Sequence, residues 1–292
     1  MNSAREFLSG IVDYAGLFPP ASLDMKSAVS AYADYRSGGD RDLLGRFVLP
    51  WKRLSEFATA AEPFLATNEE AWRLSVIATD DYADVRRAID QFNDSTRGAM
   101  CDSVETPVAT KEDVTRAVAA FPEPFDLYLE IPSVIDPHDL IAEISETPAS
   151  AKIRTGGVVE TAIPTPEQVF RFISECVNEG VSFKATAGLH HVIRGPYPLT
   201  YEPNSPKATM YGFLNVFLAA AFCASGCSES AVLSVLEETN PAAFRFDTTG
   251  VWWRDHIVLY EQLAVVRQTV ATSFGSCSFT EPVAEASYLH II

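Results

Sequence analysis

The sequence predicts an α/β protein folded as a (β/α)8 barrel, and three observations support this fold class. β-like runs alternate with helical segments at roughly 25- to 35-residue spacing, which is typical of parallel βαβ units. Seven such units and a last strand favour a closed barrel over an open sheet. The first turn, at 13–20, lacks the glycine-rich fingerprint of a doubly wound sheet. We expect a single barrel domain over 1–292.

The first five strands alternate regularly with helices. Strands are expected at 11–18, 46–50, 73–79, 99–105 and 125–131, and helices at about 24–36, 51–64, 83–92, from 111 onward and at 136–146. Gly38 and Gly39 end the first of these helices. Thr110 is a suitable N-cap, and the acidic residues that follow it suit the first turn of a helix.

The last two barrel strands are separated by an expected insertion. The sixth and seventh strands are predicted at 151–157 and 182–191, with a helix at 165–180 between them. The insertion, at 195–257, should hold a proline-rich loop up to 206, helices at 210–225 and 229–238, and a β-hairpin at 244–253. A helix at 255–269 and the eighth strand with its loop at 273–279 complete the predicted barrel.

Composition excludes several classes of partner. The formal charge of −17 argues against nucleic acid and against an anionic membrane surface, because both need a basic protein face. The longest apolar run, 213–223, is too short to span a bilayer, and residues 1–10 are too polar for a signal peptide. Five cysteines without a Cys-x-x-Cys pair suit a reduced, cytoplasmic protein. Trp252 and Trp253 indicate local packing or a subunit contact, which leaves a homo-oligomer open.

Two lysines inside predicted strands are the main chemical signal. Strand side chains alternate between faces, so Lys152 shares a face with Arg154, and Lys184 shares one with Thr186. A lysine on the inner face of a barrel is costly to desolvate without a partner or a purpose. Glu130, on the preceding strand, should lie beside Lys152. The candidate groups at the carboxyl ends of the strands are Asp13, Glu105, Glu130, Lys152, Arg154, Lys184, His190, His191, Ser276 and Ser278.

The paired lysines allow two interpretations. Two neighbouring ammonium groups, and desolvation, should lower the pKa of Lys152 or Lys184, and a neutral amine can attack a carbonyl carbon to form a Schiff base. Glu130 could then act as a base. In the alternative, these lysines, Arg154, Glu105 and Glu130 form an ion network that braces the barrel.

Short motifs resemble those of deoxyribose-phosphate aldolases and their class I aldolase relatives. Lys152-x-x-Thr155-Gly156 is similar to their sixth-strand Lys-Thr-x-Thr-Gly motif, and Phe183-Lys184-Ala185-x-Ala187-Gly188 is similar to their Lys-x-Ala-Gly-Gly motif. Leu129-Glu130 falls where that family has a strand ending in Glu-Thr. Phe274-Gly275-Ser276-Cys277-Ser278 resembles their eighth-strand phosphate loop.

The resemblance implies roles for these residues. Lys152 would be the Schiff-base lysine, and Lys184 would relay protons or lower its pKa. We expect Glu130 and His190 to complete the catalytic set. The predicted substrate-binding residues are Asp13, Glu105, Arg154, Thr155, Gly156, Gly188, His191, Arg194, Gly275, Ser276 and Ser278. The loop at 275–278 could cradle an anion or could simply be a tight turn.

The histidine pair allows other functions. His190 or His191 with Glu130 or Asp13 could hold a metal ion in a hydrolase or isomerase, although adjacent strand residues point apart. A single histidine acting as a general acid–base group is the simpler interpretation. A third hypothesis is a non-catalytic, ligand-binding barrel. The leading prediction is an aldolase-like carbon–carbon lyase acting on a small carbonyl compound with a phosphate or carboxylate group, without metal or cofactor.

Overall fold

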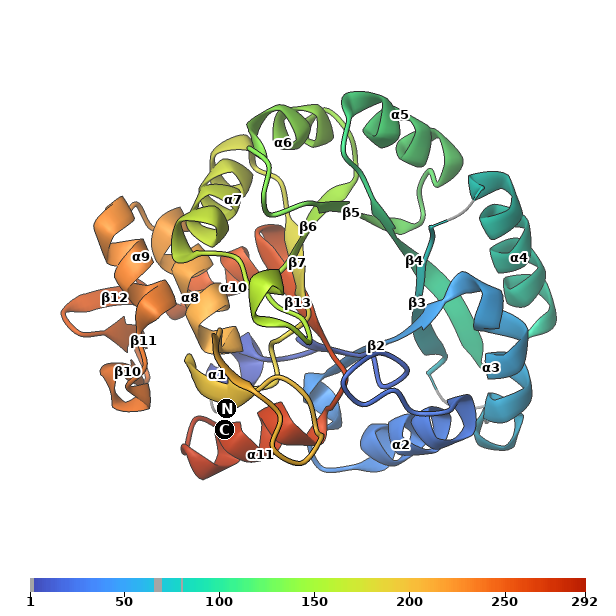
Figure 1. The fold of residues 1–292 in the computed structure, drawn as a ribbon, viewed down its shortest axis with the longest axis horizontal. Helices are drawn as coiled ribbons and strands as arrows, with labels where there is room; N and C mark the ends of the chain where they lie inside the picture. The colour runs from blue at the N-terminus through green and yellow to red at the C-terminus, as the bar shows by residue number, and fades with distance from the viewer. Residues whose placement is uncertain (1–2, 66–69, 80) are drawn as a thin grey trace.

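The computed structural model describes residues 3–65, 70–79 and 81–292, and within these ranges eight parallel strands close into a barrel (Figure 1). In order around the ring the strands are β1 (Val12–Tyr14), β2 (Leu44–Pro50), β3 (Trp72–Ile77), β4 (Ala99–Pro107), β5 (Asp126–Ile131), β6 (Ser150–Arg154), β7 (Phe183–Thr186) and β13 (Ala271–Ser276). β13 pairs with β1 and closes the ring. The predicted fold class is confirmed.

Helices surround the strand ring (Figure 1). They are α1 (Ser3–Phe7), α2 (Met25–Ser37), α3 (Leu54–Ala61), α4 (Tyr82–Ser95), α5 (Lys111–Ala120), α6 (His138–Ser145), α7 (Pro166–Glu179), α8 (Phe213–Ala224), α9 (Glu229–Glu237), α10 (Tyr260–Thr269) and α11 (Thr280–Tyr288). Short 3-10 turns lie at Arg41–Leu43, Trp51–Arg53, Glu62–Phe64, Glu160–Ala162 and Pro241–Ala243. Thr110 and Thr165 each close a capping box, which explains the starts of α5 and α7. In the described part of the chain, no helix has the length and apolar character needed to cross a membrane.

The segment between β7 and β13 differs from the predictions in detail. The expected loop up to residue 206 contains β8 (Gly195–Pro198), which pairs with β9 (Lys207–Met210). The expected hairpin is an antiparallel sheet of β10 (Phe244–Phe246), β11 (Gly250–Trp253) and β12 (His256–Leu259). The helix predicted from 255 therefore begins only at Tyr260, because the preceding residues pair with β11. The domain limits, 1–292 with 195–257 as an insertion, stay a prediction.

Apolar residues on the outer face of the barrel pack against the helices. Phe47 and Leu49 on β2, and Leu127 and Leu129 on β5, belong to this strand–helix core and are at most 3% exposed. α8 is buried almost all round, as its unbroken apolar run predicts. Each fully buried large apolar side chain stabilises the fold by about 1.5–3 kcal/mol, so this layer supplies the hydrophobic stabilisation.

The inner face of the barrel is mostly polar instead of aliphatic. Branched apolar layers usually fill a barrel of this type. Here the buried polar or charged side chains on the strands include Asp13, Arg46, Ser75, Ser103, Glu105, Lys152, Lys184 and Ser273. They bond to one another: Ser75 Oγ lies 3.0 Å from Ser103 Oγ and donates to Glu105 Oε1 at 2.7 Å. Burying so many polar groups is tolerated only because they are paired.

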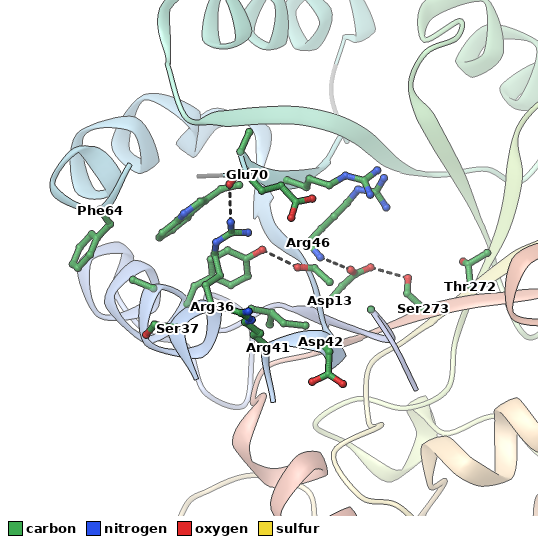
Figure 2. Close-up of a pocket in the computed structure, with 18 of the residues that line it drawn as sticks. Asp13, Arg36, Ser37, Arg41, Asp42, Arg46, Phe64, Glu70, Thr272 and Ser273 are labelled. Atoms are coloured by element: carbon green, nitrogen blue, oxygen red, sulfur yellow. Dashed lines mark hydrogen bonds between the residues drawn. The ribbon is translucent and has the colours of Figure 1, made fainter. Parts of the chain in front are cut away.

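A wide cavity opens at the amino ends of the strands (Figure 2). It has a volume of about 970 Å³, and Asp13 lies at its inner end between Arg46 and Ser273. Asp13 accepts hydrogen bonds from the Arg46 backbone N–H at 2.6 Å and from Ser273 Oγ at 2.8 Å. Arg46 also pairs with Asp102 and Asp126. Reactions on this fold take place at the opposite, carboxyl end, so we assign this end a structural role.

Candidate active site

A second cavity lies at the carboxyl ends of the barrel strands. Its volume is about 350 Å³, which falls within the roughly 300–1,000 Å³ of small-molecule sites. Its lining residues include Lys152, Lys184, Glu105, Glu130, Arg154, Gly188, His190 and Gly275 of the predicted site. This is the end of the barrel where enzymes of this fold carry their active sites.

Strand register brings the charged side chains to one level. Lys152 and Lys184 are Cα partners on β6 and β7, and Glu130 is the partner of Lys152 on β5. Neighbouring strands lie about 4.8 Å apart, so equivalent side chains on one face are adjacent. Both lysine side chains therefore point into the barrel, as alternation predicts, and they are 5% and 1% exposed.

Five charged groups form one continuous chain across the barrel interior. Glu130 Oε2 lies 2.6 Å from Lys152 Nζ, which lies 2.7 Å from Glu105 Oε2. The other oxygen of Glu105 lies 2.6 Å from Lys184 Nζ, which lies 2.6 Å from Asp13 Oδ2. Three carboxylates thus enclose two ammonium groups. The Lys152 end is the more exposed, because Glu130 is 21% exposed and Asp13, at the other end, is 2% exposed.

The carboxylates reverse the expected pKa shift of Lys184. Burial alone lowers the pKa of the Lys184 ammonium group, but Asp13 and Glu105 outweigh burial and hold that pKa above its ordinary value. Burial alone raises the pKa of Glu105, and the Lys152 and Lys184 ammonium groups overcome it and hold that pKa well below its usual range. The expectation that neighbouring lysines lower one another's pKa is therefore wrong for Lys184. The carboxylates of strands β1 and β4 dominate.

The ion network does not seal the lysines from the cavity. Both Lys152 and Lys184 line it, although they are paired with carboxylates. Lys184 Nζ also lies 5.5 Å from the centre of the Tyr128 ring, which further encloses that ammonium group. Arg154 lines the cavity with a half-exposed side chain, and its Nη1 lies 3.9 Å from Glu130 Oε1. A ligand can thus contact Lys152 and Arg154 at the same time.

The two adjacent histidines have different surroundings. His190 lines the cavity, with Nδ1 3.3 Å from Ser276 Oγ and 3.7 Å from Cys277 Sγ. Burial, helped by neighbouring His191, lowers the pKa of His190 to about 4, so the ring is neutral at pH 7. His191 turns away from the cavity lining: it stacks on Tyr197 and its Nδ1 lies 3.1 Å from a Glu285 oxygen.

The metal-binding alternative lacks a converging set of ligands. Glu130 pairs with Lys152, while His190 and His191 face Ser276 and Glu285. Across residues 3–65, 70–79 and 81–292, no group of three His, Cys, Asp or Glu side chains is placed to hold a metal ion. The geometry thus gives no support to a centre built from these histidines and Glu130.

The predicted glycines bring two loops into contact. A Cβ added at Gly188 would lie 3.0 Å from the Cα of Gly156, and Gly188 has a φ of +75°, which favours glycine. Thr155 holds the same loops together, because its backbone N–H donates to Thr186 O at 2.8 Å and its hydroxyl donates to Ala187 O at 2.9 Å. Thr155 and Gly156 shape the site without lining the cavity.

Other predicted substrate-binding residues lie outside the cavity lining. The Arg194 backbone N–H donates to Asn215 Oδ1 at 2.8 Å, and its guanidinium lies over the Tyr211 ring. Ser276 contacts His190, and Ser278 Oγ accepts a hydrogen bond from the Glu281 backbone N–H. Asp13 does not line the cavity and forms an ion pair with Lys184. Of the 275–278 loop, Gly275 and Cys277 line the cavity.

Sequence reasoning missed the apolar half of the cavity. Phe18, Val48 and Ile77 line it from the side opposite the lysines. A signal for Val48 was present, because strand alternation puts it on the same face as Arg46, whose charge marks the inner face of β2.

Comparison with protein-family models finds no match for this chain, and no curated protein matches it.

Proposed function

We propose that this protein is an aldolase-like carbon–carbon lyase that forms an imine between Lys152 and a small carbonyl compound with an anionic group. One observation carries the proposal. The Lys152 amine borders a cavity of about 350 Å³ and has Glu130, a partly exposed carboxylate, 2.6 Å away to exchange protons with it. The motif resemblance on β6, β7 and β13 supports the same chemistry.

Lys152 is a better nucleophile than Lys184. The Lys184 ammonium group is enclosed by Asp13, Glu105 and the Tyr128 ring, and its raised pKa keeps it protonated. Lys184 therefore serves as a fixed positive charge that keeps Glu105 ionised. Glu105 in turn faces Lys152, where a carboxylate stabilises the cationic iminium that forms during catalysis.

Imine formation needs one proton to travel between Lys152 and Glu130. The Lys152 ammonium group gives a proton to Glu130, and the free amine attacks the carbonyl carbon to form a carbinolamine. Protonated Glu130 returns the proton to the carbinolamine hydroxyl, the C–O bond breaks, and water leaves. The products are a protonated imine on Lys152 and the Glu130 carboxylate, so the charge of the pair is unchanged.

The iminium then accepts the electrons of the breaking carbon–carbon bond. Glu130 removes the proton of the substrate's β-hydroxyl group, the bond between the α- and β-carbons breaks, and an aldehyde departs. The remaining enamine takes that proton back at its α-carbon. Water then hydrolyses the iminium, which releases the second carbonyl product and restores Lys152. Arg154 at the mouth is placed to hold the substrate's anionic group.

Borohydride trapping tests the proposal. The protein is incubated with a panel of aldehydes and 2-oxo acids, reduced, and analysed by mass spectrometry with peptide mapping. We expect a covalent adduct on Lys152, which Lys152→Met abolishes. Lys207→Met, at an exposed lysine, is the matched control and should leave the adduct intact. An unchanged mass across the panel, or labelling spread over surface lysines, would overturn the imine chemistry.

A further inference from the structure

The candidate cavity has two chemically different walls. Strands β4 to β7 supply charged groups, among them Glu105, Glu130, Lys152 and Lys184. The facing wall comes from β2, β3 and the segment that follows β1, and its lining residues are Ala15, Phe18, Pro19, Pro20, Val48, Ile77 and Thr79. All but Thr79, at one edge, present apolar side chains.

Strand order places these walls opposite each other. In the closed ring, β2 lies four places from β6 in either direction, so Val48 faces Lys152 across the barrel mouth. β3 lies four places from β7, so Ile77 faces Lys184 in the same way. A carbonyl compound attached to Lys152 would therefore extend its far end toward Val48 and Ile77.

The protein core does not use this apolar surface. Val48 is only 4% exposed, yet among the described residues it lies outside the core cluster that contains its chain neighbours Phe47 and Leu49. Phe18 and Ile77 also lie outside that cluster. Alternation explains the difference, since Phe47 and Leu49 point to the helices and Val48 points into the barrel. The space that Val48 borders is the cavity.

We propose that Phe18, Val48 and Ile77 form a subsite for an apolar substituent of the substrate. The inference rests on the proposed imine function and narrows it: the carbonyl compound carries a branched-alkyl or aryl tail instead of a chain of hydroxyl groups. A hydroxylated tail would lose hydrogen bonds to water and regain few on this wall, whereas an apolar tail is desolvated favourably. Arg154 holds the anionic end, so the substrate class is an apolar oxo acid.

Calorimetry with acids that lack a carbonyl group tests the subsite separately from imine formation. The probes are 4-methylpentanoate and 4,5-dihydroxypentanoate, which share a carboxylate and differ in the tail. We expect the apolar acid to bind about tenfold more tightly, with a more negative heat-capacity change. Equal affinities, tighter binding of the hydroxylated acid, or no binding of the apolar acid would overturn the subsite, whatever borohydride trapping shows.

Conservative variants locate the preference. Val48→Thr keeps the shape of the side chain and replaces a methyl group with a hydroxyl group, so the ratio of the two affinities should fall by about threefold. Ile77→Thr, which also shortens the side chain, should lower the ratio in the same direction. Val134→Thr, at a side chain that is 80% exposed, is the control and should leave the ratio unchanged. Because both affinities come from the same variant, a partly unfolded sample does not alter their ratio. A ratio that Val48→Thr and Ile77→Thr leave unchanged would place the preference elsewhere and overturn the assignment.

Discussion

Lys152 and Lys184 share a single carboxylate, because the two oxygens of Glu105 lie 2.7 and 2.6 Å from their amines. The bridge makes the two lysines unequal. Lys184 has a second buried carboxylate, Asp13, and its side chain is 1% exposed. Lys152 has Glu130 instead, at the edge of the cavity. One lysine is thereby fixed as a cation and the other is left next to a substrate-sized space.

Replacing Glu105 with glutamine should destabilise the fold strongly. The change keeps the shape but removes the negative charge between two buried ammonium groups. Breaking a buried ion pair in this way costs about 3–5 kcal/mol of unfolding free energy. Urea unfolding at pH 7 measures the loss.

An exposed glutamate provides the comparison for Glu105. Glu146→Gln, at the end of α6, should change the unfolding free energy by no more than about 0.5 kcal/mol. A loss below about 1 kcal/mol for Glu105→Gln would mean that the two lysines do not depend on this carboxylate, and the charge chain would have no energetic basis.

The buried histidine should make stability fall in mild acid. The pKa of His190 is about 4 in the folded protein, against an ordinary value of 6.5. The unfolded chain therefore binds a proton as the pH falls below about 6.5, while the folded state takes one only near pH 4. This contribution to stability is complete above pH 6.5 and is lost on the way down to pH 4, by about 3 kcal/mol.

Urea unfolding between pH 7 and pH 4 isolates that loss when wild type and His190→Gln are compared. The variant should show a shallower fall over this window. His138→Gln is the matched control. The exposed His138 has a raised pKa through its hydrogen bond with Glu175, so removing it should make the fall in stability toward pH 4 steeper instead of shallower. Parallel curves for wild type and His190→Gln would show that His190 titrates normally.

Local periodicity predicted which side chains enter the barrel, but not their partners. Alternation along β6 and β7 predicted that Lys152 and Lys184 point inward, and the strand order predicted that Glu130 lies beside Lys152. The structure has both arrangements. The pairing of Lys184 with Asp13 and Glu105 joins strands β1, β4 and β7, which lie far apart in the sequence. No local pattern fixes such contacts, and so the predicted direction of the Lys184 pKa shift was wrong.

The segment between β7 and β13 shows the same limit. Its apolar helix, α8, was predicted because the run of buried residues is continuous. β12 was assigned to the following helix instead, because a short strand such as His256–Leu259 is recognisable only through its pairing with β11. The apolar wall of the cavity was missed for a related reason. Alternation puts Val48 on the inner face of its strand, but that Val48 and Ile77 lie opposite the lysines follows only from the closed ring.

Arg154→Gln should weaken the binding of anionic carbonyl compounds selectively. The guanidinium group lines the cavity and is 54% exposed, and its one ion pair within the described residues is the long contact to Glu130, 3.9 Å, so it is available to a ligand. A charged hydrogen bond at such a partly exposed site is worth about tenfold in affinity. The concentration of a 2-oxo acid that half-saturates borohydride trapping should rise by about that factor, while the maximal trapping rate stays nearly unchanged.

A neutral ketone of the same size is the matched ligand control for Arg154→Gln. Its half-saturating concentration should be the same for wild type and variant. Arg116→Gln, on the exposed face of α5, serves as the control for loss of positive charge. If both ligands weaken together, or neither does, the anion is held by another group, and the orientation proposed for the substrate is wrong.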